Sequence, residues 1–147
     1  HFSGSSGITT TEGFVINNSG NVAIGAENDT PDLTYKLTVT GDIKATGTIL
    51  QSSDERLKED IRVIDNPISR LDSIDGTIYK LKGIPGDKIG VIAQQVQEVI
   101  PEVVHEDHTG YLSVDYNGLV GVLIGAVKEQ STLIKTLEQR ISALENK

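Results

Sequence analysis

The segment Ser52 to Lys58, with the sequence SSDERLK, contains residue types that could cut a peptide bond. A serine hydroxyl becomes a nucleophile when a base takes its proton, and a lysine amine can be that base if its pKa is lowered by burial or by a cationic neighbour. Ser53 and Lys58 supply such a pair. On an uninterrupted helix their side chains would lie roughly 140° apart. A dyad therefore requires either that the segment bends or that the base comes from another chain.

The same segment is also typical of a helix start. Ser52 would be the N-cap, Glu55 would complete a capping box at the third helical position, and Lys58 would be solvated. Spacing alone favours this structural interpretation, because a Ser and a Lys five residues apart occur by chance in most proteins.

The sequence HEDH, from His105 to His108, is a second candidate site. Two histidines with acids between them could bind a metal ion, but the segment falls in a predicted turn and is typical of a solvated loop. We expect no metal site and no cofactor. His105 remains a minor candidate for assisting the Ser–Lys pair.

The composition limits the classes of partner. With 13 basic against 21 acidic residues the net charge is −8, which argues against sequence-independent binding of nucleic acid or of an anionic membrane. No apolar run approaches the roughly 20 residues of a membrane span. Met is absent, so we expect a piece of a longer polypeptide. Aromatic residues make up only 4%, so we expect the chain to gain burial by self-association.

Residues 1–52 are rich in Gly, Thr, Asn and β-branched residues, which predicts a meander of short strands. The expected strands are residues 13–18, 20–25, 35–41 and 42–49. Strands that short, with few large apolar residues, are marginal in isolation. This pattern favours a stalk in which three chains wind together and each supplies strands.

Residues 53–116 predict a small mixed α/β domain, so the fold class is α+β. A helix starts with Asn66 as N-cap and Pro67 at the first helical position. A second helix in residues 94–104 ends at Pro101. The expected strands are residues 76–83, 88–93 and 111–116.

Residues 117–147 carry a heptad repeat. The a positions are Val120, Val127, Ile134 and Ile141, and the d positions are Leu123, Gln130, Leu137 and Leu144. About four heptads with one polar seam residue indicate a coiled coil. The alternative is an amphipathic helix lying on its own domain. Oligomeric state stays open here, because β-branched a residues with Leu at d favour dimers in designed peptides.

Four blocks of sequence together resemble a known family. They are SDERLKEDI (53–61), NPISRLDSIDGTIYKL (66–81), IGVIAQQVQEVIPEVV (89–104) and YLSVDYNGLVGVLIGAVKEQ (111–130). They are similar, in order, to the C-terminal intramolecular chaperone domain of bacteriophage tailspikes, tail fibres and neck appendages, of which the endosialidase tailspikes are the best-known members. The self-cleaving domain of a membrane-bound eukaryotic transcription factor is similar too.

The resemblance implies a homotrimeric chaperone that aligns three upstream chains into a β stalk and then releases itself. It implies a cut between Ser52 and Ser53, with Ser53 as nucleophile, Lys58 as general base, and Asp54 and Arg56 in positioning roles. The protein would be made in the host cytoplasm, with the stalk in the virion and the chaperone released. The alternative is a structural trimerisation tip that is never cut. A glycan-binding tip is disfavoured, because the chain has no Trp to stack on sugars.

Overall fold

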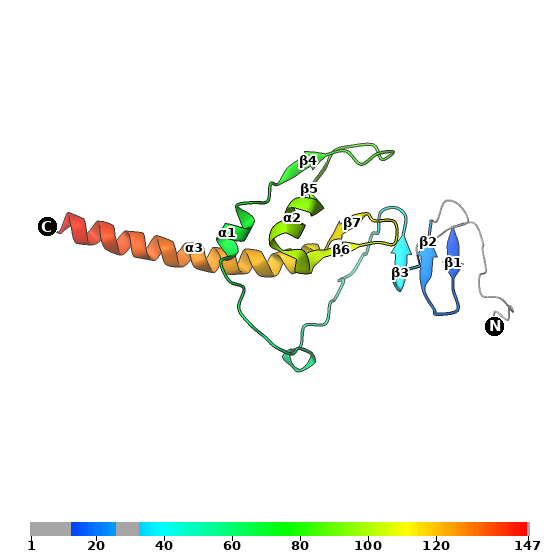
Figure 1. The fold of residues 1–147 in the computed structure, drawn as a ribbon, viewed down its shortest axis with the longest axis horizontal. Coiled ribbons are helices and arrows are strands. Elements are labelled where there is room, and N and C mark those ends of the chain that lie inside the picture. The colour runs from blue at the N-terminus through cyan, green and yellow to red at the C-terminus, as the bar shows by residue number, and fades with distance from the viewer. Residues whose placement is uncertain (1–12, 26–32, 147) are drawn as a thin grey trace. The chain divides into compact units, whose positions relative to one another are not determined.

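The structure is a computed structural model that describes residues 13–25 and 33–146 (Figure 1). The chain divides into two compact units, the first ending at Lys58 and the second beginning at Glu59. Residues 1–12 and 26–32 of the expected stalk lie outside the described residues.

The first unit contains a three-stranded sheet of β1 (Phe14–Ile16), β2 (Val22–Ile24) and β3 (Leu37–Val39). β1 and β2 are antiparallel, and the Asn17 side chain accepts hydrogen bonds from two amides of the turn between them. β2 and β3 are parallel, so the expectation of a simple meander is wrong here. Parallel neighbours need a longer crossover connection than a hairpin turn, and local turn signals do not reveal that pairing.

The two faces of this sheet differ in exposure. Side chains alternate along each strand, so Val15 and Ala23 share one face and are buried. The opposite face carries Phe14, Ile24 and Leu37, which are about half exposed although they are large and apolar. One side of the sheet is thus covered within the chain, while the other offers an apolar surface.

The chain between β3 and the first helix of the second unit forms a single short turn, η1 (Glu55–Leu57) (Figure 1). The strand expected at residues 42–49 is absent, because the segment has no pairing partner among the residues that the structure describes. Residues 40–66 are all exposed. Large apolar side chains are among them, namely Ile43, Ile49, Leu50, Leu57, Ile61, Val63 and Ile64.

The second unit mixes short strands and helices. Its elements are α1 (Pro67–Leu71), β4 (Thr77–Tyr79), β5 (Lys88–Gly90), α2 (Ala93–Val99), η2 (Pro101–Val103), β6 (Val104–Glu106), β7 (Leu112–Val114) and α3 (Tyr116–Glu145). β4 pairs with β5 and β6 with β7, both antiparallel. The expected mixed α/β character and the long C-terminal helix are confirmed. β6 was not expected, because Val104 lies at the end of the predicted second helix segment and His105 and Glu106 lie in the predicted turn.

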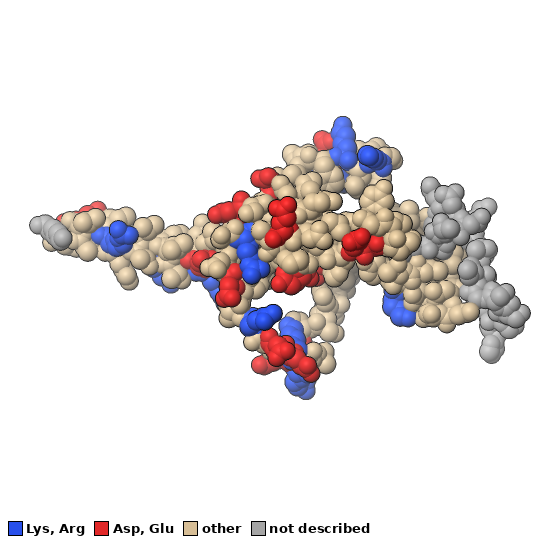
Figure 2. Space-filling view, in the orientation of Figure 1, with Lys and Arg blue, Asp and Glu red and all other residues tan. Residues whose placement is uncertain are grey.

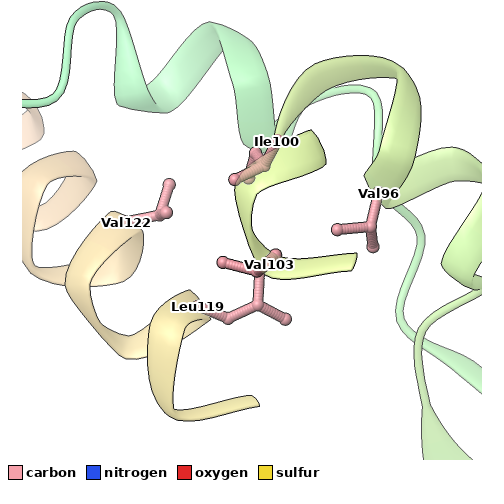
Figure 3. Close-up of a cluster of buried hydrophobic side chains, with 5 residues drawn as sticks. All are labelled: Val96, Ile100, Val103, Leu119 and Val122. Atoms are coloured by element: carbon pink, nitrogen blue, oxygen red, sulfur yellow. The ribbon is translucent and has the colours of Figure 1, made fainter. Parts of the chain in front are cut away.

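The core of the second unit is a cluster of five aliphatic side chains from α2, η2, the residue between these two elements, and α3 (Figure 3). They are Val96, Ile100, Val103, Leu119 and Val122. The expected end of the second helix at Pro101 is confirmed, since α2 ends at Val99 and Pro101 opens η2. Proline lacks the amide hydrogen that would continue the helical hydrogen bonds.

One face of the first half of α3 packs on this core and on α1. Leu119, Val122 and Ala126 are buried there. Two glycines let the backbones approach: a Cβ on Gly118 would lie 2.6 Å from Val103 Cγ1, and one on Gly125 would lie 3.3 Å from Pro67. The predicted α3 therefore docks onto its own domain, but only along this face.

The start of α1 is capped by a residue that is distant in the sequence. Asn66 occupies the N-cap position and Pro67 follows it, as expected, but the Asn66 side chain makes no capping hydrogen bond. Instead Glu129 Oε2 accepts a hydrogen bond of 3.2 Å from the Ile68 amide. A carboxylate suits a helix start, where amide hydrogens point outward without partners. The contact ties α1 to α3.

The heptad positions form a second face of α3, roughly 100° around the helix from the docked face. The seven apolar seam residues are 50–70% exposed, namely Val120, Leu123, Val127, Ile134, Leu137, Ile141 and Leu144. The amphipathic-helix alternative accounts for the docked face but not for this stripe, whose side chains stay at least half exposed. We call it the seam face below.

The glycines of α3 give a direct test of the close docking. Gly118→Ala should destabilise the protein relative to Gly121→Ala by about 1–3 kcal/mol, the usual cost of overpacking. Both changes gain about 1 kcal/mol of helix propensity, but a Cβ on Gly121 meets nothing within 4 Å. Urea unfolding followed by circular dichroism at fixed chain concentration measures the difference. Equal midpoints would contradict the docking described here.

Candidate functional site

The structure brings Ser53 and Lys58 of one chain into contact. Lys58 Nζ donates a hydrogen bond of 2.9 Å to Ser53 Oγ. The sequence left open whether the segment bends or the base comes from another chain. In the structure the segment bends. The bend is η1, a single 3-10 turn that begins after an extended Asp54 and ends at an extended Lys58. Because only this one turn separates them, the two side chains meet instead of diverging around a helix.

The capping of this turn differs from the helix-start interpretation. Asp54, not Ser52, is the N-cap, and its Oδ1 accepts a hydrogen bond of 2.9 Å from the Arg56 amide. The capping box of Ser52 and Glu55 is therefore wrong. An Asp at the N-cap satisfies an amide that the turn itself leaves unpaired. The turn is closed by backbone hydrogen bonds from Leu57 to Asp54 and from Lys58 to Glu55.

Asp54 and Arg56 also form a two-pronged ion pair, which we call the clamp. Arg56 Nε lies 3.0 Å from Asp54 Oδ1 and Arg56 Nη2 lies 2.7 Å from Asp54 Oδ2. The Arg56 side chain lowers the pKa of the Asp54 carboxyl below its ordinary value of 3.8, and the Arg56 amide lowers it further. In turn Asp54 raises the pKa of Arg56. The clamp spans the turn between Ser53 and Lys58, which makes these residues positioning candidates.

All residues from 51 to 60 are solvent exposed in the single chain. A lysine acts as a general base only in its neutral form, and loss of water is what lowers the pKa of an ammonium group. The geometry of a Ser–Lys pair is therefore present. Residues 51–60 themselves do not supply the water-free surroundings that would make Lys58 a base.

The remaining candidate residues lie elsewhere. His105 belongs to β6, in the second unit, and is exposed. Among the described residues, no group of three or more His, Cys, Asp or Glu side chains could hold a metal ion. No helix in the described ranges is long and apolar enough to cross a membrane. Figure 2 shows acidic and basic side chains interspersed on the face that it draws.

Sequence reasoning missed two features of the site. It did not identify Asp54 as the cap of the turn, although Asp two residues before Arg is the available signal. It also did not predict that a 3-10 turn, rather than an α-helix, follows the serines. Such a turn forms over so few residues that hydrophobic periodicity gives no sign of it.

Comparison with known proteins places the candidate site at the start of a family match. Residues 53–105 match the family described as the chaperone of endosialidase, whose name also marks it as a peptidase family. The chain is 36% identical over 98 residues to the long tail fiber protein Gp37 of Enterobacteria phage K3. It is 31% identical over 106 residues to the Gp37 protein of Salmonella phage S16.

These relatives are much longer than the chain. The K3 match covers 60% of this chain and 8% of the fibre protein, and the S16 match covers 65% and 14%. Myelin regulatory factor homolog 1 of Caenorhabditis elegans is 30% identical over 141 residues, which is 88% of this chain and 15% of that protein. The matches confirm the resemblance to the chaperone domain of phage tail fibres.

The clamp predicts the titration of Asp54. Its lowered pKa means that the ionised, clamped form persists from neutral pH to below 3.8, and that its contribution to the turn is lost as pH falls through the lowered value. Carboxyl carbon NMR should give a midpoint below 3.8 for Asp54. Arg56→Lys should raise that midpoint, because an ammonium cannot replace the guanidinium fork.

Asp107 is the matched control for this titration. Its pKa is also lowered, chiefly by the Thr109 hydroxyl, and Arg56 is not among the groups that lower it. The Asp107 midpoint should stay the same in the Arg56→Lys chain. An Asp54 midpoint that ignores the substitution would mean that the clamp does not form in solution.

Proposed function

We propose, from the premise that residues 53–105 match the chaperone of endosialidase, that this chain is the self-releasing chaperone end of a phage fibre. It trimerises, directs the folding of the segment upstream, and cuts the chain between Ser52 and Ser53. The observation that carries the proposal is the 2.9 Å hydrogen bond between Lys58 Nζ and Ser53 Oγ at the start of the family match.

The chemistry begins with a neutral Lys58 amine, which takes the proton of the Ser53 hydroxyl. Ser53 Oγ then attacks the carbonyl carbon of Ser52. The bond from that carbon to the Ser53 nitrogen breaks, and the nitrogen receives the proton from Lys58. The product is an ester of Ser52 on Ser53 Oγ. Water hydrolyses the ester, which leaves a carboxylate on Ser52 and restores the Ser53 hydroxyl.

Assembly supplies the missing surroundings. Residues 40–66 expose apolar side chains throughout, among them Leu57 within the turn and Ile61 just after it. Packing of these side chains against neighbouring copies removes water from the segment that contains Lys58. Loss of water lowers the pKa of an amine, so the base becomes active only in a folded assembly. Cutting is thereby made conditional on correct folding.

Two further surfaces support self-association. The seam face of α3 is an apolar stripe about half exposed along its whole length. The exposed face of the β1–β3 sheet carries Phe14, Ile24 and Leu37, whose side chains are also about half exposed. Exposed apolar stripes of this extent are typical of interaction surfaces. A parallel coiled coil consists of local contacts and therefore forms early. It raises the effective concentration of the upstream segments of the three chains, whose pairing with one another has a large entropy cost.

The relatives support the proposed role at the end of a fibre. Because the chain spans less than a sixth of each fibre protein that we compared, the rest of such a protein would be the client upstream. We propose that the stalk stays in the virion and that the cut part leaves. The released chaperone part is the segment that nucleates folding of the stalk. After its release the stalk must unfold without this template, which gives the cut product kinetic stability.

A second candidate function uses the same association without the chemistry. The exposure of residues 51–60 favours it, since a solvated lysine is a poor base. In that case the chain remains a structural trimerisation tip of the fibre, and the Ser53–Lys58 contact is only part of the turn.

Cleavage is tested by intact mass under denaturing conditions. The unaltered chain should give two fragments that separate between Ser52 and Ser53, and Ser53→Ala should stay whole. Lys58→Met should slow the cut at least about 100-fold, the usual contribution of a general base. Ser52→Ala is the matched control and should still be cut, because the reaction uses only the carbonyl group of that residue. A whole, correctly assembled parent chain would support the structural tip.

The seam face is tested by the mass of the assembly. Ile134→Lys places a charge at an a position and should weaken association at least about tenfold, which is 1.4 kcal/mol. Lys135→Ala changes the neighbouring exposed residue outside the seam and should leave association unchanged. Sedimentation equilibrium measures both. A parent chain that sediments as a monomer or dimer would contradict the trimer.

A further inference from the structure

We infer that Gln130 fixes how copies of this chain align along α3: the helices run parallel, and one Gln130 side chain from each copy meets the others in a single layer. The inference rests on the proposed self-association and goes beyond it, because contact through the seam face does not by itself set the orientation or the register of the helices. Gln130 is the polar member of the a and d positions and is exposed in the single chain.

The seam face is wide enough to be covered by two further copies of the chain. Beside the a and d residues, Ile124 at an e position and Leu133 at a g position are 54% and 53% exposed. A strict a/d stripe is narrow and suits one neighbouring helix, whereas a wider apolar stripe has room for two. The seven-residue repeat spaces the a and d side chains to fit between those of an identical helix. The occupants of the seam face are therefore copies of this chain.

The apolar seam residues alone leave the register undetermined. The a positions are all Val or Ile and three of the four d positions are Leu, so a helix displaced by seven residues still places similar side chains in each layer. Displacement puts Gln130 against Leu123 or Leu137 of a neighbour. An amide enclosed by leucine side chains loses its water and gains no hydrogen bond, which is unfavourable. In register, the amides have one another as partners, because each can both donate and accept.

The charged residues beside the seam favour parallel helices. Glu138 and Glu145 occupy e positions and Arg140 occupies a g position, and all three are exposed. In parallel helices in register, a g residue lies beside the e residue five positions later in the neighbour, which pairs Arg140 with Glu145. In antiparallel helices the e positions face each other, which brings glutamates together. Exposed pairs contribute little, so these charges bias the orientation while the enclosed amide layer fixes the register.

Alignment of the helices matters for the segments that we propose to fold upstream. A displacement of one heptad is about 10 Å along a helix, which is the length of about three strand residues. A shift between paired strands by an odd number of residues turns every side chain to the opposite face. Displaced helices would thus start the stalk with misaligned strands. Gln130 excludes them and lowers the stability of the coiled coil in return.

The test is disulfide trapping in the full chain, which has no Cys of its own. One chain carries Leu137→Cys, the other carries Leu144→Cys, and two affinity tags select assemblies that contain both. A disulfide joins Cα atoms about 4.4–6.8 Å apart, so a bond between positions 137 and 144 requires helices that are displaced or antiparallel. We expect this product to be at least about tenfold more abundant when both chains also carry Gln130→Leu.

Gln139→Leu is the control for that substitution. Gln139 is exposed at an f position, on the side of α3 away from the seam, so its replacement should leave the product as scarce as in chains with both glutamines. A product that stays equally scarce with Gln130→Leu would overturn the inference, because another part of the chain would then set the register. Abundant product in chains that keep Gln130 would overturn it as well.

Sedimentation equilibrium of the parent chain separates these results from a failure of the proposed function. A trimeric parent with either contrary result leaves trimerisation intact and removes only the role of Gln130. A monomeric parent contradicts the proposed function, and the inference fails with it.

Discussion

The packing of α3 against the small core is the contact on which the second unit depends. That core consists of a few aliphatic side chains, and α3 provides Leu119 and Val122 among them. The close approach at Gly118 and the Glu129 cap of α1 fix which side of the helix faces the domain. As a result, the heptad stripe is held away from the domain. One face of α3 is thus buried in the fold of the second unit, while the seam face stays exposed and is the surface on which we propose that other copies pack.

The first unit shows the opposite balance. Its sheet buries Val15 and Ala23, but the long segment that follows buries none of its apolar side chains. Burial of apolar surface is the main favourable term in folding, at about 25 cal/mol for each Å². A segment that leaves so much of it in water is incomplete as a single chain. The turn that holds Ser53 and Lys58 lies within this segment, so the chemistry that we propose for this pair depends on association.

The sequence predicts the elements whose signals are local. Apolar seam residues such as Val127 and Ile134 repeat every seven positions and predict the long helix α3. Pro101 predicts the end of α2. Features that depend on distant residues could not be predicted. The cap on Ile68 comes from a residue 61 positions away, and the parallel pairing of β2 with β3 has no turn signal. The Ser53–Lys58 contact is local, yet spacing alone points away from it, because it requires a 3-10 turn where helix rules predict divergence.

The compactness of the turn at residues 53–58 also bears on how such a site is inherited. The candidate nucleophile, the candidate base and both clamp residues are encoded by six consecutive codons. Recombination at any point outside this stretch transfers the whole group together, so it can be joined to an unrelated upstream gene without loss of its geometry. Matches to fibre proteins of phages and to a nematode protein, each covering a small part of the relative, are the pattern expected of a cassette that moves between genes.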